Sequence, residues 1–196
     1  MGYVMGLNFR KVKVEDAAMI LKWRTDPEIT HYLYTDIDHD VTAQENWVRR
    51  CETRGDFFHF IMCVDDRPIG YLSFADYDNH NRRCSTGNYI YESEDRRRYA
   101  GLLHTFIMDY AFFKLDCHKI INSFMAGNER IVKIQQVLKF TYVGLYRDHI
   151  FKHDRYYDVH VFELLRSEWE THRRIYTRSE TKAAFEDWSR EKNDHD

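Results

Sequence analysis

The segment GNYIYESEDRRRYAGLLH, residues 87–104, carries the strongest indication of fold and function in this chain. A strand-like run with two tyrosines leads into acidic residues, then into three arginines, Arg96–Arg98, and then into an apolar run with helical spacing. Free backbone N–H groups and the helix dipole attract anions at a helix start, and arginine adds bidentate hydrogen bonds to phosphate oxygens. The segment therefore predicts a site for a phosphorylated cofactor, and a solvated helix cap is the alternative.

Two common phosphate-binding motifs do not occur in the sequence. There is no G-x-x-x-x-G-K-[ST] and no G-x-G-x-x-G, so neither a Walker loop nor a dinucleotide fingerprint explains the arginines. The rest of the chain must identify the cofactor.

The bulk composition narrows the class of protein. A chain of 196 residues with 43% hydrophobic and 31% charged residues suits one domain with a substantial core. The formal net charge of −3 argues against nucleic acid as the main partner, because phosphate neutralisation needs a basic surface. Four scattered cysteines without a C-x-x-C pair, no signal peptide and no membrane-length apolar run lead us to expect a cytoplasmic protein with reduced thiols and no membrane association.

Hydrophobic periodicity predicts an α/β fold with a mixed, mostly antiparallel central sheet and helices on both faces. Thr42 and Glu45 suggest a capping box, Asn128 a second helix cap, and the composition shifts after Trp169. We expect one domain over residues 1–169 and a charged C-terminal helical extension or tail over residues 170–196. The predicted strands are 7–13, 56–64, 69–76, 84–91, 119–125, 141–151 and 156–165, and the predicted helices are 14–25, 42–54, 99–115 and 129–139.

Several short motifs resemble those of the GNAT superfamily of acyl-CoA N-acyltransferases over residues 7–169. They are similar to the branch that includes ribosomal-protein N-terminal, spermidine and pseudaminic-acid-pathway amino-sugar acetyltransferases. The motifs are W-R-x-D-P-x-I from Trp23 to Ile29, P-I-G-Y from Pro68 to Tyr71, N-E-R from Asn128, and the ending D-V-H-V-F-E-L-L-R-S-E-W from Asp158 to Trp169. Phe140 also lies where the family often has a G-F pair.

The resemblance implies an acetyl-CoA site with the family's pyrophosphate turn, [QR]-x-x-G-x-[GA]. Arg96 would take the first position and Gly101 the last, with Tyr99 where the middle glycine is expected; a register starting at Arg97 is the alternative. The pantetheine arm would lie along residues 89–91, in a gap between that strand and the strand 119–125, and Asn128 matches an asparagine that contacts this arm. The implied cofactor-binding residues are Tyr89, Ile90, Tyr91, Arg96, Arg97, Arg98, Ala100, Gly101, Leu102 and Asn128.

The catalytic end departs from the family pattern. Gln135 stands where many members have a tyrosine that protonates the departing thiolate, and Lys139 stands where a glycine is expected. A general base must still take a proton from the attacking amine. Glu92, Asp76 and His80 are the candidate bases, and a hydroxyl of Tyr89 or Tyr91 is the candidate acid; Glu92 and Tyr91 are preferred.

The acceptor pocket of this branch lies at the end of the first helix, which places Trp23 and Arg24 there. Arg24 could pair with an acceptor phosphate, or with Asp26 on the surface. The acids Asp36, Asp38 and Asp40 would suit a cationic amine if they are more than a solvated loop. No metal site is expected from the histidines of the last hairpin, because they lack acidic or Cys partners at a ligand spacing.

The predicted function is acetyl-CoA-dependent N-acetylation of a primary amine by direct attack on the thioester. The preferred acceptor is an amino-sugar nucleotide or another small molecule, and a protein N-terminus or a polyamine is the alternative. A catalytically impaired GNAT-like binding module is a further alternative, favoured by Tyr99, Gln135 and Lys139. The resemblance and the aromatic closing strands also make a homodimer plausible.

Overall fold

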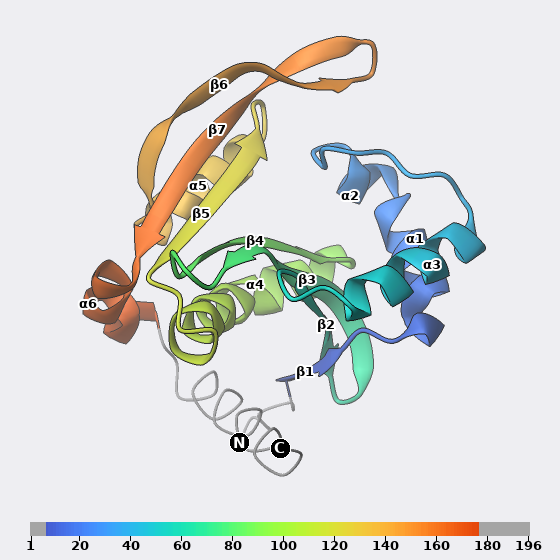
Figure 1. The fold of residues 1–196 in the computed structure, drawn as a ribbon, viewed down its shortest axis with the longest axis horizontal. Coiled ribbons are helices and arrows are strands. Elements are labelled where there is room, and N and C mark those ends of the chain that lie inside the picture. Colours follow the sequence, from blue (N-terminus) through green and yellow to red (C-terminus); the bar gives the residue numbers. More distant parts are fainter. Residues whose placement is uncertain (1–6, 177–196) are drawn as a thin grey trace.

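A computed structural model describes residues 7–176 as a seven-stranded sheet with helices on both faces (Figure 1). The strand order is β1-β2-β3-β4-β5-β7-β6, and every neighbouring pair is antiparallel except β4 and β5. The predicted fold class is therefore confirmed. The strands are β1 Leu7–Lys11, β2 Phe58–Val64, β3 Arg67–Asp78, β4 Arg83–Ile90, β5 Lys119–Met125, β6 Thr141–Lys152 and β7 Arg155–Leu165.

The helices divide between the two faces of the sheet. Strand β2 is buried on both sides: Phe60 and Met62 join the core under α4, whereas Ile61 and Cys63 join the core under α1 and α3. Figure 1 shows α1, α2 and α3 grouped together at one side of the molecule. The helices are α1 Ala17–Arg24, α2 Pro27–Thr30, α3 Val41–Glu52, α4 Ser93–Asp109, α5 Glu129–Val137 and α6 Arg166–Tyr176, with a 3₁₀ turn Val14–Asp16 and a π-helical turn Tyr110–Lys114.

Helix α4 begins six residues earlier than the sequence predicts, at Ser93 instead of residue 99. Glu94 and Asp95 occupy its first turn, where the helix dipole favours acids, and arginine is itself a good helix former. Arg96–Arg98 therefore lie within the helix and do not form a turn in front of it.

Two other predicted starts are also corrected. The cap of α3 is Asp40, whose Oδ1 accepts a hydrogen bond from Ala43 N at 3.0 Å, so the predicted Thr42 capping box is wrong. The first predicted helix is a 3₁₀ turn followed by α1, because Asp16 turns its carboxylate back to Arg10 and to Lys13 N. The predicted cap Asn128 is confirmed: its Oδ1 accepts from Ile131 N at 3.4 Å.

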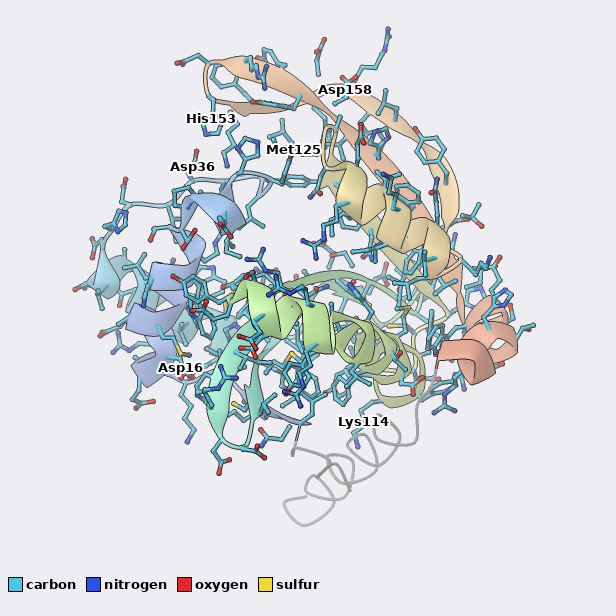
Figure 2. The ribbon with its side chains drawn as sticks, turned by 180° about the vertical axis from the view of Figure 1, so that it is seen from behind. Asp16, Asp36, Lys114, Met125, His153 and Asp158 are labelled. Atoms are coloured by element: carbon cyan, nitrogen blue, oxygen red, sulfur yellow. The ribbon has the colours of Figure 1, made fainter. Side chains whose placement is uncertain are left out.

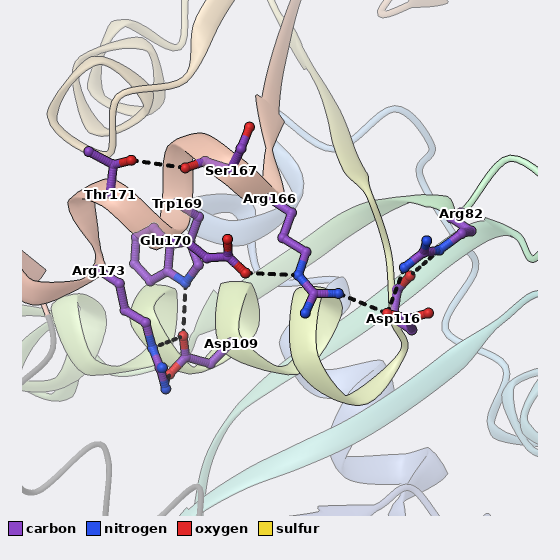
Figure 3. A network of polar contacts seen from close by, with 9 residues as sticks. All are labelled: Arg82, Asp109, Asp116, Arg166, Ser167, Trp169, Glu170, Thr171 and Arg173. Carbon is purple, nitrogen blue, oxygen red and sulfur yellow. Dashed lines mark hydrogen bonds and ion pairs between the residues drawn. The ribbon is translucent and has the colours of Figure 1, made fainter.

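Helix α6 docks onto α4 through one buried carboxylate, Asp109, which is 1% exposed. Trp169 Nε1 donates to Asp109 Oδ1 at 2.8 Å, and Arg173 donates to both carboxylate oxygens at 3.0 Å (Figure 3). Residues 170–176 of the predicted extension thus continue this helix, and the remainder of that extension lies outside the described residues.

Candidate active site

The two central strands separate in the middle of the sheet. Strands β4 and β5 pair only at Arg83 with Lys119 and at Cys84 with Ile120. Two residues further along β5, the side chain of Asn122 takes the place of the backbone hydrogen bonds between the strands. Its Oδ1 accepts hydrogen bonds from Thr86 N at 2.9 Å and from Thr86 Oγ1 at 3.1 Å.

Beyond Thr86 the edge of β4 that faces β5 has no strand partner among residues 7–176. Alternate residues of a strand direct their N–H and C=O groups to the same side, so Asn88 and Ile90 present theirs to the gap, as Thr86 does. Tyr91 N bonds to Ile69 O on the opposite side, which agrees with this alternation. The open edge can therefore pair with an extended ligand that carries amide groups.

A cavity of about 890 Å³ lies along this gap, between α4 on one side and α5 on the other. Six of the residues predicted for cofactor or substrate binding line it. They are Arg24, Tyr89, Ile90, Arg96, Ala100 and Asn128.

Arg96 is the one arginine of the cluster on the cavity wall. Its Nη2 donates to Glu28 Oε2 at 3.0 Å and to Tyr91 O at 3.1 Å, while its Nε is buried with no hydrogen-bond partner in residues 7–176. Arg97 and Arg98 are exposed, and Arg98 lies over the Tyr99 ring at 5.4 Å. Gly101 is also exposed and Leu102 packs against the core, so neither lines the cavity.

Tyr99 does not obstruct the cavity, although it replaces an expected glycine. Its side chain is buried in the main core and does not line the cavity. The side of α4 that faces the cavity therefore begins with Arg96 and Ala100, one helical turn apart, and continues through residues 103–108.

Helix α5 supplies the opposite wall. Asn128 caps it at the cavity mouth, and Gln135 lies two turns further on the same face. Gln135 is 3% exposed, and its Oε1 has no hydrogen-bond partner in the described part of the chain. The open β4 edge, the free Arg96 Nε and these two amides all fit a long anionic cofactor with amide groups, as acetyl-CoA has.

A second cavity of about 740 Å³ meets the first across β4. Arg24, Ser73, Asn88 and Tyr89 line both cavities, so a ligand in one can reach a ligand in the other at this point. The arrangement suits a reaction between two bound molecules.

Arg24 and its predicted companion Trp23 have different surroundings. Arg24 Nη2 donates to Thr35 O and Oγ1 at 3.3 and 3.1 Å, and within residues 7–176 it pairs with no carboxylate, so the predicted alternative of an Asp26 pair is wrong. Trp23 is 4% exposed, stacks on Tyr91 with ring centroids 5.9 Å apart, and lines neither cavity. The geometry places Arg24 at the site and Trp23 in the core behind it.

The structure does not bring the preferred catalytic pair to the cavities. Glu92 is exposed, Tyr91 packs against Trp23 and Lys22, and neither residue lines a cavity. Asp76 and His80 are likewise absent from both walls. Of the two candidate acids, Tyr89 lines the cavities: its Oη is buried without a partner among the described residues, and burial raises its pKa.

The acidic segment after α2 is largely occupied by internal contacts. Lys152 Nζ, whose side chain is 3% exposed, pairs with Asp36 Oδ1 at 2.8 Å and donates to Thr30 O and Leu33 O at 2.7 and 2.9 Å. Its hydrogen bond lowers the pKa of Asp36. Figure 2 labels Asp36 and His153 where this segment and the tip of the β6–β7 hairpin approach each other.

Some residues of the walls were not predicted as site residues. Asn122 and His104 occupy ordinary positions of a strand and a helix, and no motif marks them. Tyr34 closes the cavity by donating to Ser123 Oγ at 2.7 Å, a contact between residues 89 positions apart that no local pattern can indicate.

Neither a metal site nor a membrane span is apparent in residues 7–176. No group of three His, Cys, Asp or Glu side chains there could hold a metal ion, and no helix there is long and apolar enough to cross a bilayer.

Comparison with known proteins identifies the family. Residues 7–141 match the acetyltransferase (GNAT) domain family. The chain is 27% identical over 172 residues to the uncharacterised N-acetyltransferase p20 of Bacillus licheniformis, covering 85% of this chain and 97% of that protein. It is 22% identical over 134 residues to the acetyltransferase PseH of Campylobacter jejuni strain 81-176, covering 68% and 82%.

The fold resembles that of a solved enzyme with its cofactor. The spermidine N-acetyltransferase of Vibrio cholerae, in complex with CoA and spermine, superposes with a TM-score of 0.78 at 19% identity, covering 84% of this chain and 98% of that one. This likeness supports the fold. The match over residues 7–141 shows that the chain belongs to the GNAT acetyltransferase family and is an N-acetyltransferase, with acetyl-CoA as its co-substrate.

Proposed function

We propose that this enzyme acetylates the primary amine of a small molecule that also carries an anionic group, with an amino-sugar nucleotide as the best candidate. The observation that supports this acceptor is Arg24, a guanidinium without a carboxylate partner in the described chain, at the junction of the two cavities. Guanidinium groups recognise phosphates and carboxylates by bidentate hydrogen bonds.

The charges of the second cavity support the same acceptor. Arg50 lines it and, like Arg24, has no ion pair within residues 7–176. Asp36 is neutralised by Lys152, and Asp40 caps α3. The wall therefore offers two guanidinium groups beside the carboxylates of Asp38 and Asp40, a mixture of charges that suits an acceptor with both an amine and an anionic group.

In the proposed reaction the chain mainly positions and polarises the reactants. Acetyl-CoA supplies the activated acetyl group as a thioester. Asn88 N–H and Ile90 N–H face the gap and can donate to the thioester oxygen as negative charge develops on it. The amine attacks the carbonyl carbon from the second cavity, a C–N bond forms, and the C–S bond breaks to release CoA.

Among the described residues that line both cavities, no carboxylate or imidazole can accept the proton of the amine. We propose that it leaves through water. The buried Tyr89 hydroxyl is then placed to donate a hydrogen bond to a reactant, since its raised pKa keeps it protonated.

Replacing Arg24 tests this function. The Arg24→Ala enzyme should show a KM for an anionic amine about 10–100 times higher, which is what losing a hydrogen bond to a charged group costs. The Kd for acetyl-CoA should change less than about threefold. Arg49→Ala is the matched control, because Arg49 is exposed, pairs with Glu45 and lines neither cavity.

The assay measures free CoA released with a nucleotide-linked amino sugar, spermidine and a peptide amine as acceptors. A preference for spermidine, or an Arg24→Ala enzyme with unchanged KM, would contradict the proposed acceptor. Tight binding of acetyl-CoA without turnover of any acceptor would favour the impaired binding module, which Gln135 at the tyrosine position supports.

A further inference from the structure

The inner part of the first cavity contains an unsatisfied polar group. Gln135 Oε1 is buried, yet none of residues 7–176 donates a hydrogen bond to it. Most of the neighbouring wall is apolar and comes from α4, from α5 and from the segment that follows α5. The apolar residues are Leu103, Ile107, Met108, Ile134, Leu138 and Phe140.

An acceptor oxygen without a donor in such surroundings destabilises the ligand-free protein. His104, from α4, lines the same cavity and has no hydrogen-bond partner in the described chain either. Burial lowers the pKa of His104 to about 4, so its imidazole is neutral near pH 7. Of the two side chains, Gln135 is the one with a buried atom that lacks a partner among the described residues.

The position of Gln135 selects the ligand. Gln135 lines the first cavity and not the second, so it faces the cofactor and not the acceptor. It lies on the same face of α5 as Asn128, two turns further along the helix, and is buried where Asn128 is partly exposed. A pantetheine arm carries two secondary amides, and each offers an N–H donor.

We propose that Gln135 is a positioning residue whose Oε1 accepts a hydrogen bond from an amide N–H of the pantetheine arm. The proposal rests on the proposed function, since it requires acetyl-CoA in the first cavity. It gives Gln135 a role that needs no proton transfer, because an amide cannot act as a general acid.

The test compares Gln135→Met with Gln136→Met in the full-length protein. Methionine nearly preserves the size of glutamine and removes the unsatisfied oxygen. Gln136 is the adjacent residue on α5, is exposed, and lines neither cavity. Kd is measured by calorimetry for acetyl-CoA and for adenosine 3′,5′-bisphosphate, which lacks the arm, and the unfolding midpoint is measured without ligand.

Gln135→Met should raise the ligand-free midpoint by about 2–4 °C and raise the Kd for acetyl-CoA about threefold to tenfold. It should leave the Kd for the bisphosphate unchanged, and Gln136→Met should change none of the three values. This pattern, with stability and affinity moving in opposite directions, is not produced by a residue with a purely structural role.

An unchanged Kd for acetyl-CoA in Gln135→Met would overturn the proposal, and so would an equal loss of affinity for both ligands. A higher KM for the amine with an unchanged Kd for acetyl-CoA would assign Gln135 to the acceptor and overturn it as well. Failure of the unsubstituted protein to bind acetyl-CoA is a different result, because that would contradict the proposed function itself.

Discussion

At the scale of single residues, chemistry at the site depends on which side chains reach a cavity. Tyr89 and Tyr91 belong to the same strand-like run, but Tyr89 lines both cavities whereas Tyr91 lies beyond the end of β4 and packs on Trp23. The sequence suggests equal roles for the two tyrosines, but tertiary packing brings only Tyr89 to the cavities. The roles assigned to Glu92, Tyr91 and Trp23 stay predictions that the geometry does not favour.

A buried histidine gives the clearest dependence on pH. His59 lies among Trp47, Phe57 and Tyr71, and burial lowers its pKa to about 4. The unfolded chain binds a proton near pH 6.5, so its contribution to stability is present above that pH and is lost as the pH falls from 6.5 towards 4.

Unfolding in urea between pH 7.5 and 4 checks this effect. The free energy of unfolding should fall by about 3 kcal/mol more in the unsubstituted protein than in His59→Gln over this range. Near pH 7.5 the two curves should differ only by the constant cost of losing the Tyr71 contact, and the extra loss in the unsubstituted protein should appear below about pH 6.5. Parallel curves would show that His59 titrates normally.

At the scale of helices and strands, the sequence was most informative where the hydrophobic pattern matched local geometry. Residues 119–125 were predicted as a strand and form β5 with the same bounds, and Asn128 caps α5 as expected. The start of α4 was missed because three arginines read equally well as a basic turn and as a helix surface. The resemblance implied the gap between β4 and β5, but the contact of Asn122 with Thr86 at its start, between residues 36 positions apart, could not be predicted.

The docking of α6 onto α4 should depend on Asp109 more than on the surface ion pairs of the same helix. Asp109→Asn keeps an acceptor for Trp169 but removes the bidentate pair with Arg173, and should destabilise the protein by about 1–3 kcal/mol (Figure 3). Arg173 can turn towards solvent, which keeps the cost below that of a fully trapped charge.

Arg166→Ala is the control for this prediction. Arg166 pairs with Glu170 and Asp116 at a more exposed position, and such pairs contribute less than about 1 kcal/mol. Both free energies come from urea unfolding at pH 7. Equal losses in the two variants would mean that Asp109 does not anchor α6.

At the scale of the whole molecule, the central feature is a sheet that opens between two strands and joins a cofactor cavity to an acceptor cavity. The order of strands and helices was sufficient to indicate this architecture, and the short motifs indicated Arg24, Arg96 and Asn128 on its walls. The charge balance of the acceptor cavity could not be read from the sequence, because Lys152 reaches Asp36 from a hairpin 116 positions away in the chain. A homodimer stays a prediction.

The central claim is that acetyl-CoA binds in the first cavity, with Arg96 as its contact among the three arginines. Thermal unfolding with and without acetyl-CoA, in the unsubstituted protein, Arg96→Ala and Arg97→Ala, tests it most directly. A concentration of about 100 times Kd should stabilise the unsubstituted protein by about 2.7 kcal/mol, and Arg97→Ala should retain most of that shift while Arg96→Ala loses much of it. No shift at millimolar acetyl-CoA, or equal losses in the two variants, would contradict the account.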